Sequence, residues 1–277
     1  MHNATKFRTA FLGLLSLGFV LPATAQTPVA TYQFSGNLLA DQGGVTALTA
    51  VDPAAANGFV SDTPFGVSRT VYRFAGDQAG GASNAALEGG LQLNTTSLIP
   101  SNSYSVEMVL SLDQVNGYRR LTDTQDRGSD NGFYVISSGL QEYPQPGSAL
   151  TGFAANTYYD VVLTVSNAAS NNVTAYLNST PYFTVTSTDS NILTNTLNFF
   201  LDNGNNEYSN GKIALVRLFD APLTSGEVAN LYNNGNPFPN AAPAATPEPG
   251  AFALFGAFGG AGLLLARKRR RKGDAAS

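Results

Sequence analysis

Short segments rich in β-branched and aromatic residues recur along the middle of the chain, and several of them alternate apolar with polar positions. Asn, Gly, Asp, Ser and Pro separate these segments, which is typical of turns between antiparallel strands. The pattern predicts an all-β antiparallel sandwich or barrel. The clearest predicted strands are Ala30–Phe34, Thr70–Phe74, Tyr104–Leu112, Gly132–Ile136, Tyr159–Val165, Val173–Leu177, Tyr182–Thr186, Leu197–Leu201 and Lys212–Phe219.

One helix is predicted after the last of these strands. Thr224 or Ser225 can cap its N-terminus, and Glu227 lies in its first turn. Apolar side chains follow at helical spacing, namely Val228, Leu231 and Tyr232. The Asn-Asn-Gly sequence at 233–235 ends the helix. We therefore expect one domain over residues 26–236, followed by a Pro- and Ala-rich linker over 237–246.

The N-terminus has the three parts of a secretory signal peptide. Lys6 and Arg8 form a charged region, residues 11–21 are apolar, and an Ala-Thr-Ala sequence ends at Ala25. This pattern predicts a signal peptide over residues 1–25 that the translocon and signal peptidase process, so that the mature chain begins at Gln26. An uncleaved N-terminal anchor helix is the alternative.

The C-terminus combines a turn-like tripeptide, an apolar segment and a basic cluster. Pro247, Glu248 and Pro249 precede an uncharged membrane segment at 251–266, and a polar tail occupies 273–277. The basic cluster between them consists of Arg267, Lys268, Arg269, Arg270, Arg271 and Lys272. A spanning helix needs roughly 20 apolar residues, so this glycine-rich segment predicts a marginal anchor helix whose basic end stays on the cytoplasmic side. A buried core helix and a nucleic-acid-binding tail are the alternatives.

This order of parts resembles the PEP-CTERM sorting signal of Gram-negative bacteria that make exopolysaccharide. In that family an exosortase, which is a membrane transpeptidase, recognises the signal and is thought to cleave near the Pro-Glu-Pro. The resemblance covers residues 247–272. It implies that the protein is held transiently at the inner membrane and is then released to the cell surface or the extracellular space.

Charge and composition exclude several functions. Of the 15 basic residues, two lie in residues 1–25 and six in residues 250–277, whereas only one of the 19 acidic residues lies in these two ends. The remaining span therefore has 7 basic and 18 acidic residues, and such a surface repels nucleic acid. The chain has no cysteine, and its only histidine is His2. The mature chain thus lacks the residues of Ser-His-Asp and Cys-His catalysis, and a zinc site is not expected.

Several segments together resemble the laminin-G-like, or concanavalin A-like, jelly roll. The segments that carry the resemblance are Tyr32–Leu38 with Asp41, Tyr104–Leu110, Tyr118–Asp123, Ser129–Val135, Asn156–Val165 and Gly211–Thr224. The resemblance implies an antiparallel jelly-roll sandwich with one short C-terminal helix, to which the terminal apolar anchor helix is added. The family includes lectins, adhesive modules and glycoside hydrolases, so the fold does not decide the function.

The strands carry no recognisable catalytic group. A glycosidase normally needs two carboxylates about 5 to 10 Å apart, and on one strand these would lie two or four residues apart. No predicted strand has this spacing. Glu107 stands alone between Val106 and Met108, and we interpret it as a polar strand position or as the partner of Arg119 or Arg120. No catalytic residue is therefore predicted.

Calcium is the ligand that the loops suggest, because hard cations prefer oxygen ligands. The candidate ligands are Asp123, Asp126, Asp130, Asp202 and Asn203. Their spacing does not match an EF-hand, and solvated loops with Asx-turns are the favoured interpretation of these residues. In relatives, a structural calcium often uses an Asp in the closing strand and another in the first turn. Ala214 and Ser35 stand at the corresponding positions here.

Tyrosines near loops could stack on sugar rings, and the candidates are Tyr118, Tyr143 and Tyr208, although tyrosine near strand ends usually serves packing.

Two functions follow from the sequence. The first is a non-enzymatic surface or matrix protein that binds carbohydrate or protein in an exopolysaccharide or biofilm layer. The second is a glycan-cleaving enzyme that uses an unrecognised carboxylate pair such as Asp123 and Asp130.

Overall fold

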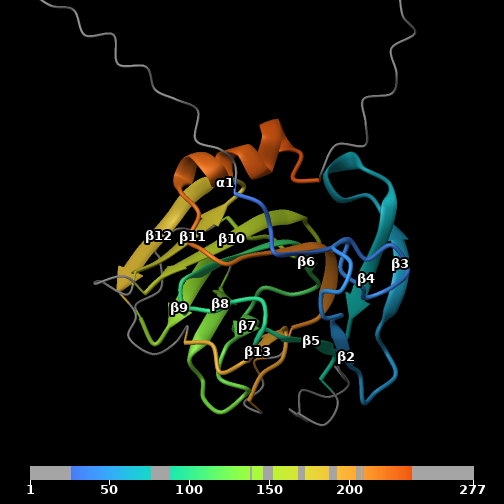
Figure 1. Cartoon of the computed structure of the whole chain (residues 1–277). Helices are drawn as coiled ribbons and strands as arrows, with labels where there is room; N and C mark the ends of the chain where they lie inside the picture. The colour runs from blue at the N-terminus through green and yellow to red at the C-terminus, as the bar shows by residue number, and fades with distance from the viewer. Residues whose placement is uncertain are drawn as a thin grey trace, which may run out of the picture.

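Strands from distant parts of the sequence form two antiparallel sheets packed face to face (Figure 1). The computed structural model describes residues 26–75, 88–137, 139–145, 152–167, 172–186, 192–203, 207 and 209–238. The predicted signal peptide, sorting signal and anchor helix lie outside these residues, as does Tyr208. No helix within the described ranges is long and apolar enough to span a membrane.

The first sheet has the strand order β12-β11-β10-β6-β14-β4-β3, and β1 pairs with β14 beside β4. Its strands are β1 (Ala30–Tyr32), β3 (Gly58–Asp62), β4 (Arg69–Phe74), β6 (Tyr104–Leu112), β10 (Tyr159–Ser166), β11 (Asn172–Leu177), β12 (Thr180–Thr186) and β14 (Gly211–Phe219). The central strands β6 and β14 are buried on both faces because the second sheet covers one face and a helix with its flanking loops covers the other.

The second sheet has the order β2-β5-β13-β7-β8-β9. Its strands are β2 (Thr49–Val51), β5 (Gly90–Asn94), β7 (Tyr118–Asp123), β8 (Gly132–Ile136), β9 (Gly139–Tyr143) and β13 (Thr196–Phe199). Alternate residues of these strands enter the shared core, for example Leu121, Phe133 and Val135. The residues between them lie on the outer face, where the candidate site is found.

The core fills the space between the sheets with apolar side chains from both. Val106, Met108 and Leu110 of β6 are fully buried there. Phe74 of β4 stacks on Phe200, which follows β13, with ring centroids 3.7 Å apart. Burial of each such side chain stabilises the fold by about 1.5–3 kcal/mol. A domain without disulfides can therefore be held together by this core.

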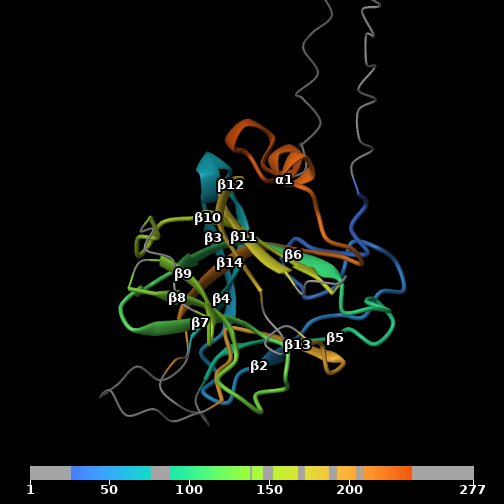
Figure 2. The ribbon, with the colours of Figure 1, turned by 90° about the vertical axis from the view of Figure 1, so that its left-hand side faces the viewer.

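Helix α1 (Ser225–Tyr232) lies over the outer face of the first sheet (Figures 1 and 2). Thr224 and Glu227 form a capping box, in which the Thr224 hydroxyl accepts from the Glu227 backbone and the Glu227 carboxylate accepts from the Thr224 backbone. Val228 packs against Val162 and Phe219. Asn233 ends the helix in the left-handed conformation, with φ 34°. Short 3₁₀ turns occupy Pro64–Gly66 and Asn233–Gly235.

The predicted antiparallel sandwich and the short helix are confirmed. β6 and β8 have the predicted bounds. Two predicted strands were too long at their C-terminal ends, because Phe34 and Phe200 have φ of 55° and 65°, which takes the backbone out of the extended region. The pattern analysis also missed strands that pair at or near sheet edges, namely β2, β3, β5 and β9.

Candidate functional site

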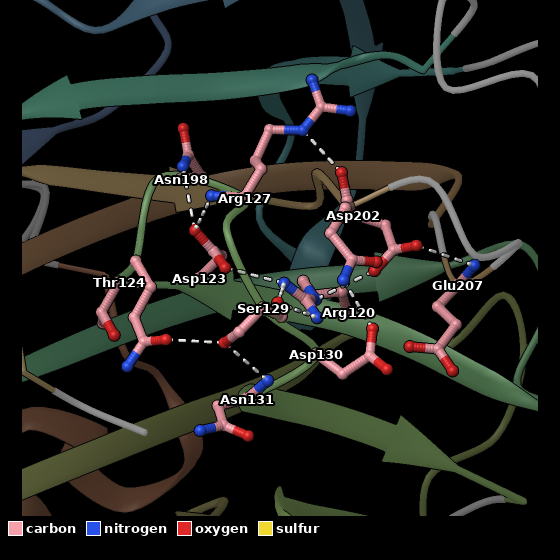
Figure 3. A network of polar contacts seen from close by, with 12 residues as sticks. Arg120, Asp123, Thr124, Arg127, Ser129, Asp130, Asn131, Asn198, Asp202 and Glu207 are labelled. Atoms are coloured by element: carbon pink, nitrogen blue, oxygen red, sulfur yellow. Dashed lines mark hydrogen bonds and ion pairs between the residues drawn. The ribbon is translucent and has the colours of Figure 1, made fainter. Parts of the chain in front are cut away.

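A polar network occupies the outer face of the second sheet, under the segments 124–131 and 200–203 and beside Glu207 (Figure 3). Strand register aligns its first members in a row. Asn198 of β13 lies opposite Gln92 of β5 on one side and opposite Asp123 of β7 on the other. The Gln92 amide donates to Asn198 over 3.0 Å, and the Asn198 amide donates to Asp123 over 3.1 Å. The sheet itself therefore positions the first part of this network.

Arg120 is the centre of the network, and its side chain is completely buried. Its guanidinium lies 2.7 Å from Asp123 and 3.2 Å from Asp202, and it donates to the Ser129 carbonyl over 3.1 Å. It also donates to the Tyr134 hydroxyl, which in turn donates to the Asp130 carbonyl. A buried ion is tolerated only with partners in good geometry. Arg120 thus fixes both covering loops to the sheet.

The predicted calcium ligands gather around this guanidinium. Asp123 and Asp202 both face Arg120, and Asp123 also accepts from the Arg127 backbone N–H over 2.8 Å. Asn203 donates to Asp130 over 2.6 Å, whereas Asp126 is exposed in the turn. Within the described residues, no group of three or more acidic side chains is placed to hold a metal. The geometry does not favour calcium at these positions, because Arg120 already supplies the positive charge between the carboxylates.

Glu88 and Arg127 extend the network, and the sequence analysis missed both. Arg127 donates to Glu88 over 2.6 Å and to the Asp202 carbonyl over 2.5 Å, while the Asp202 backbone N–H donates to Glu88 over 2.7 Å. Burial raises the pKa of Glu88 to about 7, against the lowering effects of the Asp202 N–H and Arg127. The arginine pair of β7 beside the predicted oxygen ligands was a signal that could have suggested this network.

A small pocket of about 100 Å³ opens beside the network and is lined by Tyr118, Asp130, Tyr143 and Glu207. We call it the tyrosine–carboxylate pocket. The rings of Tyr118 and Tyr143 meet edge to face with centroids 6.1 Å apart. Buried Tyr134 contacts both rings from behind, at 5.6 Å and 6.4 Å. The structure thus joins two of the predicted tyrosines and one predicted oxygen ligand in one pocket.

The second carboxylate of the pocket, Glu207, is held by its backbone. Its carbonyl accepts from the Arg120 N–H over 2.8 Å, and its N–H lies 3.4 Å from Asp202. Burial raises the pKa of Glu207, and the nearby carboxylate of Asp202 raises it further. Two carboxylates therefore face the pocket, whereas Arg120 lies behind it.

The catalytic pair considered from the sequence, Asp123 and Asp130, does not line a common pocket. Asp123 is fully buried and ion-paired with Arg120, so it faces the interior of the network. Asp130 lines the tyrosine–carboxylate pocket together with Glu207. The bulge between Arg120 and Thr122 and the fold of the covering loops decide this arrangement, and neither is visible in residue spacing.

A second buried polar cluster lies on the outer face of the first sheet, under α1. The interpretation of Glu107 as a partner of Arg119 or Arg120 was wrong, because these arginines belong to the other sheet. Glu107 accepts instead from Arg217 of β14, which lies directly opposite in register. The single acid of one apolar strand and an arginine within the apolar run of another were the signal that could have suggested this pair.

Asp160 of β10 completes this cluster. It is fully buried, and neither of its carboxylate oxygens has a hydrogen-bond partner within the described part of the chain. Burial raises the pKa of Asp160 well above its ordinary value, and Glu107 raises it further. Burial likewise raises the pKa of Glu107 to about 7, although Arg217 opposes the shift. The cluster is therefore a place where protonation and folding are linked.

Comparison with known proteins identifies the architecture. A family model described as Concanavalin A-like lectin/glucanases superfamily matches residues 84–229, which is more than half of the chain. A search of curated proteins found no match.

Solved structures with the same fold are distant in sequence. Domain 4 of AbnA, a GH43 extracellular arabinanase from Geobacillus stearothermophilus in complex with arabinotriose, has a TM-score of 0.53 at 15% identity, with 75% of this chain and 99% of that domain covered. The binding domain of Paraclostridial Mosquitocidal Protein 1 has a TM-score of 0.53 at 13% identity, and 74% and 52% of the two chains are covered. The binding domain of Botulinum neurotoxin DC, in complex with rat synaptotagmin II, has a TM-score of 0.52 at 14% identity, with 74% of this chain and 51% of that chain covered. This chain therefore spans about half the length of these toxin domains.

Proposed function

Because the chain belongs to the Concanavalin A-like lectin/glucanases superfamily, we propose that it is an exported surface or matrix protein whose jelly-roll domain binds carbohydrate. The observation that carries this proposal is the tyrosine–carboxylate pocket on the outer face of the second sheet.

The chemistry of the pocket suits sugar hydroxyls. The carboxylates of Asp130 and Glu207 are acceptors, and the phenol groups of Tyr118 and Tyr143 both donate and accept. The tyrosine rings also offer an apolar surface to the C–H groups of a sugar ring. A volume of about 100 Å³ receives one projecting group of a ligand, so the rest of the saccharide would lie across the pocket mouth.

The walls of the pocket are positioned before a ligand arrives. The Glu207 carbonyl is bonded to the Arg120 N–H, and the Asp130 carboxylate is bonded to Asn203. Tyr134 supports both tyrosine rings from behind. Groups that are already ordered lose little conformational entropy on binding, which favours affinity. The structural neighbour solved with arabinotriose supports the proposal that this fold presents a saccharide site.

The proposed location follows from the two ends of the sequence. The signal peptide would direct export, and cleavage after Ala25 would leave Gln26 at the N-terminus. Recognition of Pro247, Glu248 and Pro249 by an exosortase would release the domain from its transient anchor into an exopolysaccharide layer. Mass spectrometry of the exported protein tests this directly. A mature chain that retains residues 251–272 would contradict the sorting proposal.

A glycan array and a pull-down on the host's own polysaccharide test the binding proposal. Tyr143→Ala and Glu207→Gln should each weaken retention by roughly tenfold, because both remove groups that line the pocket. The matched control is Asp220→Asn, which alters an exposed carboxylate outside the pocket. Unchanged retention of the folded pocket variants, or retention of a protein partner and no glycan, would contradict carbohydrate binding at this pocket.

Glycan cleavage is a second candidate, since two carboxylates line one pocket and the pKa of Glu207 is raised, as a general acid requires. Binding is favoured because the pocket is too small to enclose a sugar ring between the two groups. Release of reducing ends from polysaccharide by the wild type, and its loss in both Asp130→Asn and Glu207→Gln, would establish the enzyme instead.

A further inference from the structure

A larger cavity of about 440 Å³ lies on the opposite side of the sandwich. It is formed where β1 meets β14 beside the C-terminal end of α1, and Arg217 lies in its wall. Its lining also includes Gln33, Asp41, Asn230, Asn233 and Phe238. The volume falls within the ordinary range of small-molecule sites. We call this cavity the helix-end cavity.

The charged groups of the helix-end cavity are already compensated by the protein. Arg217 is bonded through one nitrogen to both Glu107 oxygens, at 3.1 and 2.9 Å. Asp41 accepts from Gln33 over 2.6 Å and attracts Arg69 electrostatically, although burial and the nearby Arg217 together lower the pKa of Arg69. The cavity therefore creates no demand for a charged ligand.

The neutral groups of the cavity remain available. Neither the Asn230 nor the Asn233 side chain has a hydrogen-bond partner within the described ranges. Each amide presents both donors and an acceptor, which is what a hydroxyl group needs from a binding site. Asn230 lies in the last turn of α1 and Asn233 is its C-cap residue, and both line the cavity.

Phe238 borders the cavity but is only 5% exposed, because its ring packs with Val71 and Leu215. Arg69 lies over one face of its ring, with the guanidinium carbon 4.0 Å from the centroid, which fixes the ring in place. Phe65 contacts the same ring edge to face at 6.4 Å. The cavity therefore places solvent-exposed amides beside a mostly buried aromatic border, and a sugar ring offers hydroxyls to the first and C–H groups to the second.

We propose that the helix-end cavity is a second binding site, which takes a neutral sugar residue. The tyrosine–carboxylate pocket lies on the outer face of the other sheet, so the two sites point to opposite sides of the sandwich. One domain can then bind two segments of polysaccharide at once and cross-link them. Only this cross-linking rests on the function proposed above.

The test uses the protein in its exported form, titrated with glucose, galactose, arabinose and their short oligosaccharides. Two-dimensional NMR should show shifts of the Asn230 and Asn233 side-chain amides. Asn230→Ala should weaken this binding by about fivefold, the effect of one lost hydrogen bond. Ala229→Gln is the matched control, because Ala229 is an exposed neighbour on α1 that does not line the cavity. Tyr143→Ala should leave the response at Asn230 unchanged.

Three results would overturn the proposal. The first is that none of these neutral sugars moves either amide, and the second is that Asn230→Ala binds as well as wild type. The third is a preference for glucuronate or glucosamine over glucose at this cavity. If Tyr143→Ala leaves polysaccharide retention unchanged, that result contradicts only the tyrosine–carboxylate pocket and not the helix-end cavity. Precipitation of the polysaccharide should require both sites, so each single-site variant should bind without precipitating it.

Discussion

Arg217 and Glu107 lie directly opposite each other on β14 and β6, and one guanidinium nitrogen contacts both carboxylate oxygens within 3.1 Å. Both side chains lie under α1, where water is largely excluded. This pair joins the centre of the first sheet to the wall of the helix-end cavity. Burial removes both charges from water, which costs free energy, and it also strengthens the attraction between them.

Replacement of Arg217 by Met should destabilise the protein by about 3–5 kcal/mol at pH 8, because it leaves ionised Glu107 buried without a counter-charge. At pH 5 the loss should be smaller, since a protonated carboxyl needs no positive partner. Denaturant unfolding at the two pH values checks this. The double variant Arg217→Met/Glu107→Gln should recover much of the loss. Equal losses in the single and double variants would contradict the pairing.

The stability of the wild type should fall as the pH rises from about 4 to about 7. Burial raises the pKa of Glu107 to about 7 and that of Asp160 well above its ordinary value, whereas carboxyls of the unfolded chain ionise near pH 4. In this window the unfolded chain releases protons that the folded protein keeps, so unfolding becomes more favourable. Glu88 adds a contribution of the same sign. Asp160→Asn should make the free energy of unfolding less dependent on pH. An unaltered slope of that free energy against pH would contradict the role of Asp160.

Arg120→Lys should destabilise the protein by about 3–5 kcal/mol and abolish glycan binding at the tyrosine–carboxylate pocket. A lysine ammonium cannot reproduce the planar set of bonds to Asp123, Asp202 and Ser129. Unfolding and glycan retention are measured on the same preparation. Arg119→Lys in the same strand is the control, and a comparable loss of binding in that variant would contradict the central role of Arg120.

Calcium should not stabilise the domain, because the Arg120 guanidinium lies between the carboxylates that could have bound the ion. The measurement is thermal unfolding in excess CaCl₂ and in excess EDTA, at matched ionic strength. The two midpoints should coincide. A higher midpoint in calcium that is lost in Asp130→Asn would restore the loop site predicted from the sequence.

Thr224→Ala should lower the free energy of unfolding by about 1 kcal/mol, because it removes the N-cap of α1. The neighbouring Ser225→Ala is the control, since Ser225 lies inside the helix and does not provide the cap. Equal stability of the two variants in denaturant would contradict the capping box.

Much of the fold could be predicted because the signals that specify it are local. The alternation in Tyr104–Leu112 predicted β6 with its observed bounds, and the spacing after Thr224 predicted α1. The missed edge strands β2 and β3 expose most of their residues, so they lack the apolar pattern on which strand prediction depends. The resemblance of several segments to the concanavalin A-like family extended the prediction from strands to a jelly roll.

The candidate site could be predicted only in fragments. Tyr118, Tyr143 and Asp130 were named separately from the sequence, but nothing in their spacing indicated that they share a pocket with Glu207. The partner of Glu107 was assigned to the wrong sheet for the same reason. Which residues meet across strands depends on register, and register is set by pairing between distant segments.

The sequence by itself determined the class of the fold, the capped helix α1 and the acidic, histidine- and cysteine-free character of the span between the two ends. These properties depend on composition and on neighbours along the chain. Only the tertiary structure decided that Arg120 takes the centre of the oxygen-rich loops, that Arg217 neutralises Glu107, and that the two cavities lie on opposite faces. Electrostatic partners act over a few ångströms, and folding brings them that close from segments up to 110 residues apart.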